Sequence, residues 1–146
     1  MNTNQDEHFM AAALAEAGKA VEKQEVPIGA VVVCNNMIIA RAHNMTETLR
    51  DPTAHAEMQA ITAATDWIGG KYLTECSVYV TVEPCAMCAA ALGWSQAGRL
   101  VYGADDKNKG YTGIKGVLLH PKTTVTSGVM KKECGELVEK FFKIRR

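Results

Sequence analysis

Residues 77–92 read SVYVTVEPCAMCAAAL, and this stretch decides the fold. Its first six residues alternate in the manner of a strand and are rich in β-branched and aromatic side chains. Pro84 then has the fixed φ that suits the first turn of a helix, and the alanine-rich run over 85–92 predicts that helix. A strand followed directly by a helix indicates an α/β protein.

The sequence before this stretch continues the alternation. An amphipathic stretch over 6–24 predicts a helix that Pro27 ends. Apolar runs over 28–34 and 37–40 enclose the turn dipeptide Asn35–Asn36, which predicts a β-hairpin.

Asp51–Pro52 has the residue types of an N-cap and a first helical position, so the alanine-rich stretch 53–65 predicts a second helix. The elements expected later in the chain are a strand over 99–103, a glycine-containing loop over 104–121, a strand over 123–126 and a helix over 130–143. This order predicts one domain over residues 1–146, with a mixed sheet flanked by helices. Strands joined through helices should run parallel.

Composition narrows the possible partners. The chain has 146 residues, 47% of them hydrophobic, and its 16 basic residues balance its 16 acidic ones. A neutral total gives no general affinity for nucleic acid, but residues 131–146 carry six Lys or Arg against three Glu. No apolar run approaches the roughly 20 residues of a membrane span, and the apolar stretch 9–15 lacks the preceding basic residues of a signal peptide. We expect a cytoplasmic protein without a membrane partner.

His55 and the pair Cys85 and Cys88 predict a metal site. One His and two Cys are the three ligands that a catalytic zinc keeps while its fourth position takes water. Cys85 and Cys88 are three residues apart and share one helix face. The intervening helix and strand can return the second helix beside the first. Glu57 is then the nearby carboxylate that can carry a proton.

The pattern His-x-Glu followed by Pro-Cys-x-x-Cys resembles the zinc-dependent cytidine deaminase-like superfamily. The segments that are similar to its bacterial tRNA-specific adenosine deaminases are 26–31, Asn44, 51–57, 79–88 and 141–146. The resemblance implies a three-layer α/β/α fold with a mixed sheet of about five strands. It also implies one Zn²⁺ per chain on His55, Cys85 and Cys88, with Glu57 as the proton carrier.

The same resemblance implies that adenosine is deaminated hydrolytically to inosine at the anticodon wobble position of tRNA, by zinc-activated water. Asn44 would hydrogen-bond the nucleoside, and Asp106 would lie beside the flipped nucleotide. The basic C-terminal helix, with Phe141, Phe142, Lys143, Arg145 and Arg146, would contact the anticodon stem-loop. A homodimer is a further expectation, for which the sequence adds only the small-residue stretch 86–94.

Three alternatives stay open at this point. The same chemistry could act on a free base or nucleoside, such as guanine or cytosine. The zinc could be structural, with Cys34, Cys76 or Cys134 as a fourth ligand. The chain could also be a zinc-containing RNA-binding module without catalysis, although such a module has no need of Glu57.

Overall fold

The computed structural model describes residues 3–145, so Arg146 of the predicted basic tail lies outside the described residues. The elements are α1 (Thr3–Glu22), β1 (Gly29–Cys34), β2 (Met37–His43), α2 (Ala56–Ile68), β3 (Cys76–Val82), α3 (Ala86–Trp94), β4 (Arg99–Ala104), a 3-10 turn (Tyr111–Gly113), β5 (Thr124–Thr126) and α4 (Lys131–Arg145). Among the described residues, no helix combines the length and the apolar character that crossing a membrane requires.

The five strands form one mixed sheet in the order β2-β1-β3-β4-β5. Strand β1 is antiparallel to both β2 and β3, whereas β3, β4 and β5 run parallel. The predicted hairpin is confirmed, and Asn35 and Asn36 both have the positive φ, 52° and 61°, that its tight turn requires. The predicted mixed α/β sheet is therefore confirmed.

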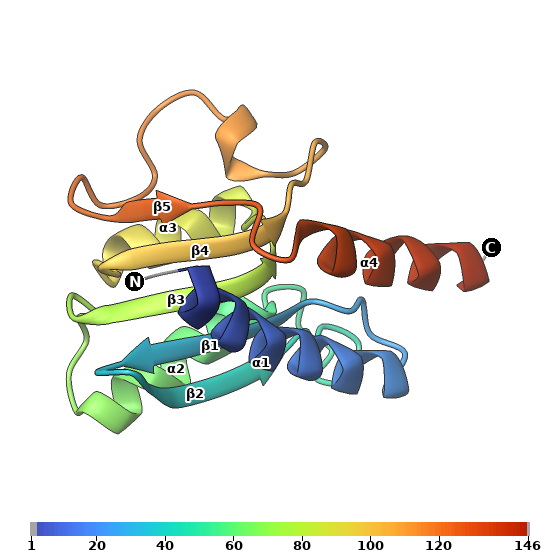
Figure 1. The fold of residues 1–146 in the computed structure, drawn as a ribbon, viewed down its shortest axis with the longest axis horizontal. Helices are drawn as coiled ribbons and strands as arrows, with labels where there is room; N and C mark the ends of the chain where they lie inside the picture. The colour runs from blue at the N-terminus through green and yellow to red at the C-terminus, as the bar shows by residue number, and fades with distance from the viewer. Residues whose placement is uncertain (1–2, 146) are drawn as a thin grey trace.

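Helices cover both faces of the sheet, with α1 and α4 in front and α2 and α3 behind it (Figure 1). Successive side chains of β3 serve the two cores: Val78 and Val80 pack with α2, and Tyr79 packs with α1. Gly29 lets α1 approach the sheet closely, because a Cβ at this position would lie 2.0 Å from the carbonyl oxygen of Ala13. The molecule is a three-layer α/β/α sandwich.

Two helix boundaries differ from the sequence prediction. Asp51 does not cap a helix that begins at 53, because its Oδ1 accepts hydrogen bonds from the backbone N–H (2.9 Å) and the hydroxyl (2.7 Å) of Thr53 and closes a local turn. Helix α2 begins only at Ala56, and its N-cap is His55. Helix α1 ends at Glu22 rather than at the predicted residue 24, because Gln24 adopts a left-handed φ of 61°. The first correction matters for the site, since it moves His55 to the helix end.

A buried ion pair joins α1 to the middle of the sheet. The Asp6 carboxylate accepts hydrogen bonds from Arg99 Nη1 and Nη2, both at 2.7 Å, and from the Tyr79 hydroxyl at 2.7 Å. These residues come from α1, β4 and β3, and Asp6 is only 4% exposed. Bidentate pairing with a second donor is the arrangement in which a buried carboxylate is stabilised.

We therefore expect Asp6→Asn to lower the free energy of unfolding at pH 7 by about 3 kcal/mol, because Arg99 keeps its charge and loses its partner. The hydrogen bonds from Arg99 hold the pKa of Asp6 below its ordinary value of 3.8. A depressed pKa means that this stabilisation is complete well above pH 3.8 and disappears as the pH falls below it. Urea unfolding of both proteins at pH 7 and near pH 3 measures the difference. An equal stability at pH 7 would contradict the assigned role.

Candidate metal centre

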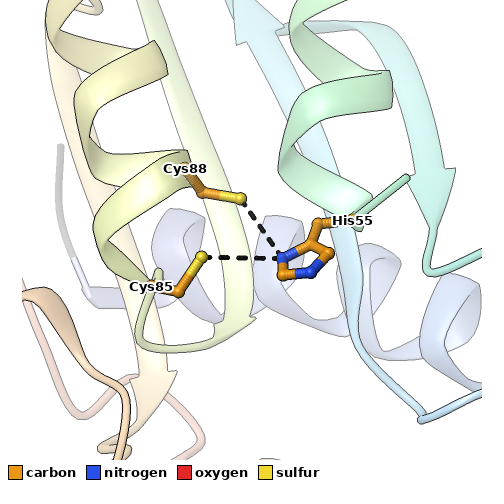
Figure 2. Close-up of side chains that lie close together, drawn as sticks. All are labelled: His55, Cys85 and Cys88. Atoms are coloured by element: carbon orange, nitrogen blue, oxygen red, sulfur yellow. Dashed lines mark hydrogen bonds between the residues drawn. The ribbon is translucent and has the colours of Figure 1, made fainter. Parts of the chain in front are cut away.

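The site lies where the N-termini of α2 and α3 meet behind the sheet. His55 is the N-cap of α2 and Cys85 is the N-cap of α3, and both have extended backbone conformations. Neither side chain accepts a capping hydrogen bond from its own helix, although Ser, Thr, Asp or Asn at this position usually would. The His and Cys side chains are instead directed toward one another, as Figure 2 shows.

The three side chains have the spacing of zinc ligands. His55 Nδ1 lies 3.6 Å from Cys85 Sγ and 3.5 Å from Cys88 Sγ. Zn–N and Zn–S bonds of about 2.05 and 2.3 Å at a tetrahedral angle place N and S about 3.5 Å apart. One Zn²⁺ therefore fits between the three atoms, and its fourth position is left for a ligand that the protein does not supply.

The other cysteines do not complete a closed structural site. Within residues 3–145, the one cluster of His, Cys or acidic ligand atoms is His55, Cys85 and Cys88. Cys134 is buried in the core on the opposite face of the sheet, and Cys34 and Cys76 lie at the far ends of β1 and β3. This arrangement favours an open, catalytic site over a structural one.

Glu57 lies beside the cluster, in the first turn of α2, and is 4% exposed. The two-residue separation from His55 would direct the side chains apart within a helix, but His55 precedes the first helical residue. Burial raises the pKa of Glu57 to about 7. A carboxyl group with this pKa can both accept and donate a proton near neutral pH.

The surroundings of Cys85 and Cys88 change the pKa values of these thiols in opposite directions. The hydrogen bond from Cys88, followed by that from His55, lowers the pKa of Cys85 to about 3, while Cys85 and burial raise the pKa of Cys88. These contacts thus favour the thiolate form at Cys85 and the protonated thiol at Cys88. The N-terminal ends of α2 and α3 carry partial positive charge and stabilise the thiolate. Binding of Zn²⁺ would displace the remaining proton.

A pocket of about 250 Å³ opens onto the cluster. Among its lining residues are Ile28, Asn44, Thr46, His55, Glu57, Val82, Glu83, Cys85, Asp106 and Lys109. All of the predicted site residues line it except Cys88, which is fully buried. The volume lies just below the roughly 300–1,000 Å³ of sites for drug-sized molecules, so it suits one small ring system. The structure thus places Asn44 and Asp106 at the pocket, and their individual roles stay predictions.

Two buried glutamates, which were not predicted from the sequence, fix the loops that form the walls of this pocket. Glu25 accepts hydrogen bonds from the N–H and hydroxyl of Thr48, both at 2.6 Å, and from the Glu47 N–H at 3.1 Å. It fixes the loop after Asn44. Glu25 and Glu83 each adjoin an apolar strand, 28–34 and 77–82, but a glutamate at such a boundary can be solvated as well as buried, so the sequence contains no decisive signal.

Glu83 holds the opposite wall. It accepts hydrogen bonds from the Asp106 N–H at 3.0 Å and from the N–H and hydroxyl of Thr112 at 3.0 and 2.7 Å. Gly110 packs directly on the Glu83 carboxylate, where a Cβ would lie 2.2 Å from Oε2. Lys109, on the same loop, also lines the pocket, and nothing in its sequence context marks it.

Comparison with known proteins agrees with this geometry. Residues 3–104 match the family model of the cytidine and deoxycytidylate deaminase zinc-binding region. The tRNA-specific adenosine deaminase of Bacillus subtilis is 46% identical over 144 residues, which covers 95% of this chain and 89% of the relative. A solved structure from studies of A-to-I editing by tRNA:A34 deaminases is 42% identical, with a TM-score of 0.84 over 89% of this chain and 98% of that one.

A guanine deaminase structure from Bacillus subtilis is also similar. It is 36% identical, with a TM-score of 0.65 over 72% of this chain and 66% of that one. The fold is therefore common to deaminases whose named substrates differ.

We expect one zinc ion per chain, and Cys85→Ala should reduce the zinc content of the purified protein to well below one equivalent. Cys34→Ala is the matched control, because Cys34 is a free thiol outside the cluster. Atomic absorption on both variants measures the difference. Full zinc content in Cys85→Ala, or equal loss in the control, would contradict the assignment.

Proposed function

Because the chain belongs to the cytidine and deoxycytidylate deaminase zinc-binding family, we propose that it deaminates adenosine to inosine at the anticodon wobble position of tRNA. The observation that carries the proposal is the open His55, Cys85 and Cys88 cluster with Glu57 beside it, in a pocket sized for one base. The 46% identity to a tRNA-specific adenosine deaminase, over 95% of this chain, supports the substrate.

His55, Cys85 and Cys88 would hold the ion. Zn²⁺ in such a site lowers the pKa of water from about 16 to about 7 and so supplies a nucleophile at neutral pH. In the net reaction, water adds at C6 of adenine and ammonia leaves. Glu57 would take one proton from the water and deliver it to ring N1, and it would then pass the second proton, from the hydroxyl now on C6, to the departing amino group. Its raised pKa, about 7, suits both directions of transfer.

The walls of the pocket would orient the base. The Thr46 N–H donates to Asn44 Oδ1 at 3.4 Å, which orients the Asn44 amide at the pocket. Asp106 accepts hydrogen bonds from the N–H groups of Asn108 and Lys109, both at 3.0 Å, and so shapes the loop on the other side. We propose that Asn44 hydrogen-bonds the nucleoside and that the Asp106 loop contacts the flipped nucleotide.

A second groove extends from the pocket toward α4, and we propose that it receives the stem-loop. Residues 105–109 and Phe142 line it, and it shares Asp106 and Lys109 with the pocket. Phe142 is 45% exposed and available for stacking on a base, whereas Phe141 is buried. Lys140 and Lys143 are exposed on the same helix. A free base would have no need of Phe142, Lys140 or Lys143.

The substrate is tested by incubating the zinc-loaded protein separately with an adenosine-containing anticodon stem-loop, guanine and cytosine, and analysing the products by mass spectrometry. We expect inosine in the stem-loop and no conversion of the free bases. The similarity to a guanine deaminase makes guanine the competing candidate. Conversion of guanine with an unchanged stem-loop would overturn the proposed substrate and leave the chemistry intact.

Glu57→Gln separates an enzyme from a zinc-containing binding module. We expect turnover to fall by about 10²–10⁴-fold, because the amide cannot carry the proton. Zinc content should stay at one equivalent, since Glu57 is not part of the ligand cluster. Glu75→Gln, at an exposed glutamate just before β3, is the control and should keep full activity. An unchanged rate in Glu57→Gln would remove its proposed role.

We also propose a cytoplasmic homodimer. All five cysteines are free, as expected in a reducing compartment. Trp94 is 85% and Val117 83% exposed, and both border one surface groove with Tyr72 and Leu119. An exposed apolar patch of this kind is typical of a protein–protein contact, and a second copy of the chain is its proposed occupant.

Trp94→Glu should then shift the mass measured by light scattering from that of a dimer to that of one 15.8 kDa chain. Ile144→Glu is the matched control. Ile144 is also an exposed apolar residue, 74% exposed, but it lies on α4, across the sheet from α3 (Figure 1). A monomeric parent protein, or a dimer that survives Trp94→Glu, would contradict this surface.

A further inference from the structure

A second pair of cysteines lies outside the metal centre. Cys34 ends β1 and Cys76 begins β3, and the two are directly opposite in the antiparallel register. Directly opposite residues project their side chains from the same face of a sheet. Here it is the face covered by α2 and α3, because Cys76 belongs to that core and Cys34 packs against it.

The backbone hydrogen bonds show which kind of pair this is. In a hydrogen-bonded antiparallel pair, each residue donates its N–H to the other. The Cys76 N–H donates instead to the Leu73 carbonyl at 3.0 Å, so Cys34 and Cys76 form a non-hydrogen-bonded pair. In such a pair the Cα atoms are about 4.5 Å apart and the side chains approach most closely. Disulfides span Cα separations of about 4.4–6.8 Å, so the usual spacing of such a pair lies within the range that a disulfide requires.

The two thiols differ in their access to solvent. Cys34 is half-buried, whereas Cys76 is 2% exposed. Burial, together with a hydrogen-bonding contact to Cys34, raises the pKa of Cys76 to about 12. The accessible thiol is therefore the one that meets an external reagent first, and the buried thiol is held next to it.

The pair is well separated from the zinc ligands. Strand β3 runs from Cys76 to Val82, and Val82 lines the active-site pocket. Six steps of about 3.3 Å place the two ends roughly 20 Å apart. The pair thus lies at the far end of the sheet from the zinc ligands. Its thiol chemistry is independent of the proposed deaminase activity.

We propose that Cys34 and Cys76 are a redox pair that closes a reversible cross-strand disulfide on reaction with a low-molecular-weight disulfide such as oxidised glutathione. The Cys34 thiolate attacks one sulfur of the reagent, and its S–S bond breaks to release one glutathione thiolate. The Cys76 thiol then attacks Cys34 Sγ and expels the second glutathione thiolate, which takes up the proton that Cys76 loses. Two protein thiols are oxidised, one disulfide is reduced to two glutathione thiols, and the two thiol protons pass to these products.

Closure of the disulfide would link the neighbouring strands β1 and β3. It would enclose residues 35–75, which include β2 and α2. A cross-link around a loop of this length removes conformational freedom from the unfolded chain. We expect oxidation to raise Tm by about 5–10 °C and reduction to restore the starting value. In a reducing compartment such a bond is transient, which is the usual behaviour of a redox-responsive pair.

The test uses the zinc-loaded protein and oxidised glutathione. We expect an intact mass lower by two hydrogen atoms, a disulfide-linked peptide pair that contains Cys34 and Cys76, and an unchanged zinc content. Dithiothreitol should reverse both the mass change and the Tm shift. Cys34→Ser is the matched variant, since it keeps the buried Cys76 and should show neither change. Cys134→Ser, which alters a buried thiol on the opposite face, should still form the cross-link.

Three results would overturn the proposal. One is a stable glutathione adduct on Cys34 with no intramolecular bond. Another is a protein that stays fully reduced with oxidised glutathione although the half-buried Cys34 thiol reacts with an alkylating reagent. The third is a cross-link that involves Cys85 or Cys88 and releases zinc, because the reactive pair would then be the metal ligands.

Discussion

The structure depends on one constraint: two helix N-termini must point at the same small volume. His55 and Cys85 occupy the N-cap positions of α2 and α3, where a residue that caps its own helix would normally stand. Each helix forgoes a cap worth about 1 kcal/mol, so that both side chains can face the metal site. The proposed zinc ion would compensate, since it would satisfy the ligands that the helices leave unused. Its binding would thereby couple to the folding stability of the protein.

The sheet places the walls of the pocket next to these ligands. The first residue of β1 and the last residue of β3 lie at the end of the sheet that faces the metal ligands. The buried side chains of Glu25 and Glu83 adjoin these two strands. Each carboxylate is satisfied by hydrogen bonds from one loop, 46–48 for Glu25 and 106–112 for Glu83. Such groups are costly to bury unless all their partners are in place. The two loops are thus held in single positions before any substrate arrives.

The sequence was informative where one residue type has few roles. The position of the candidate site was predicted from His55, Glu57, Cys85 and Cys88. The order of apolar runs predicted all five strands and four helices. The start of α2 was wrong because Asp51 has equally good options in a turn and at an N-cap, and only its contact with Thr53 decides. Glu25, Glu83 and Lys109 were missed because their roles come from tertiary contacts. Nothing local distinguishes a buried glutamate from a solvated one.

The metal centre alone cannot set the substrate in this family. The solved structures from studies of tRNA:A34 deaminases and of a guanine deaminase share the fold although their named substrates differ. Substrate choice must lie in what surrounds the pocket. A free base is enclosed by the pocket alone, whereas a base within a stem-loop brings its backbone and neighbouring bases to the rim. Here the rim carries the groove of residues 105–109 and Phe142, with exposed lysines on α4. Lys107 and Lys109 line this groove together with Asp105, Asp106 and Glu139, so its charge is mixed. The position of α4 beside the Asp106 loop is the feature on which the proposed preference for a stem-loop rests.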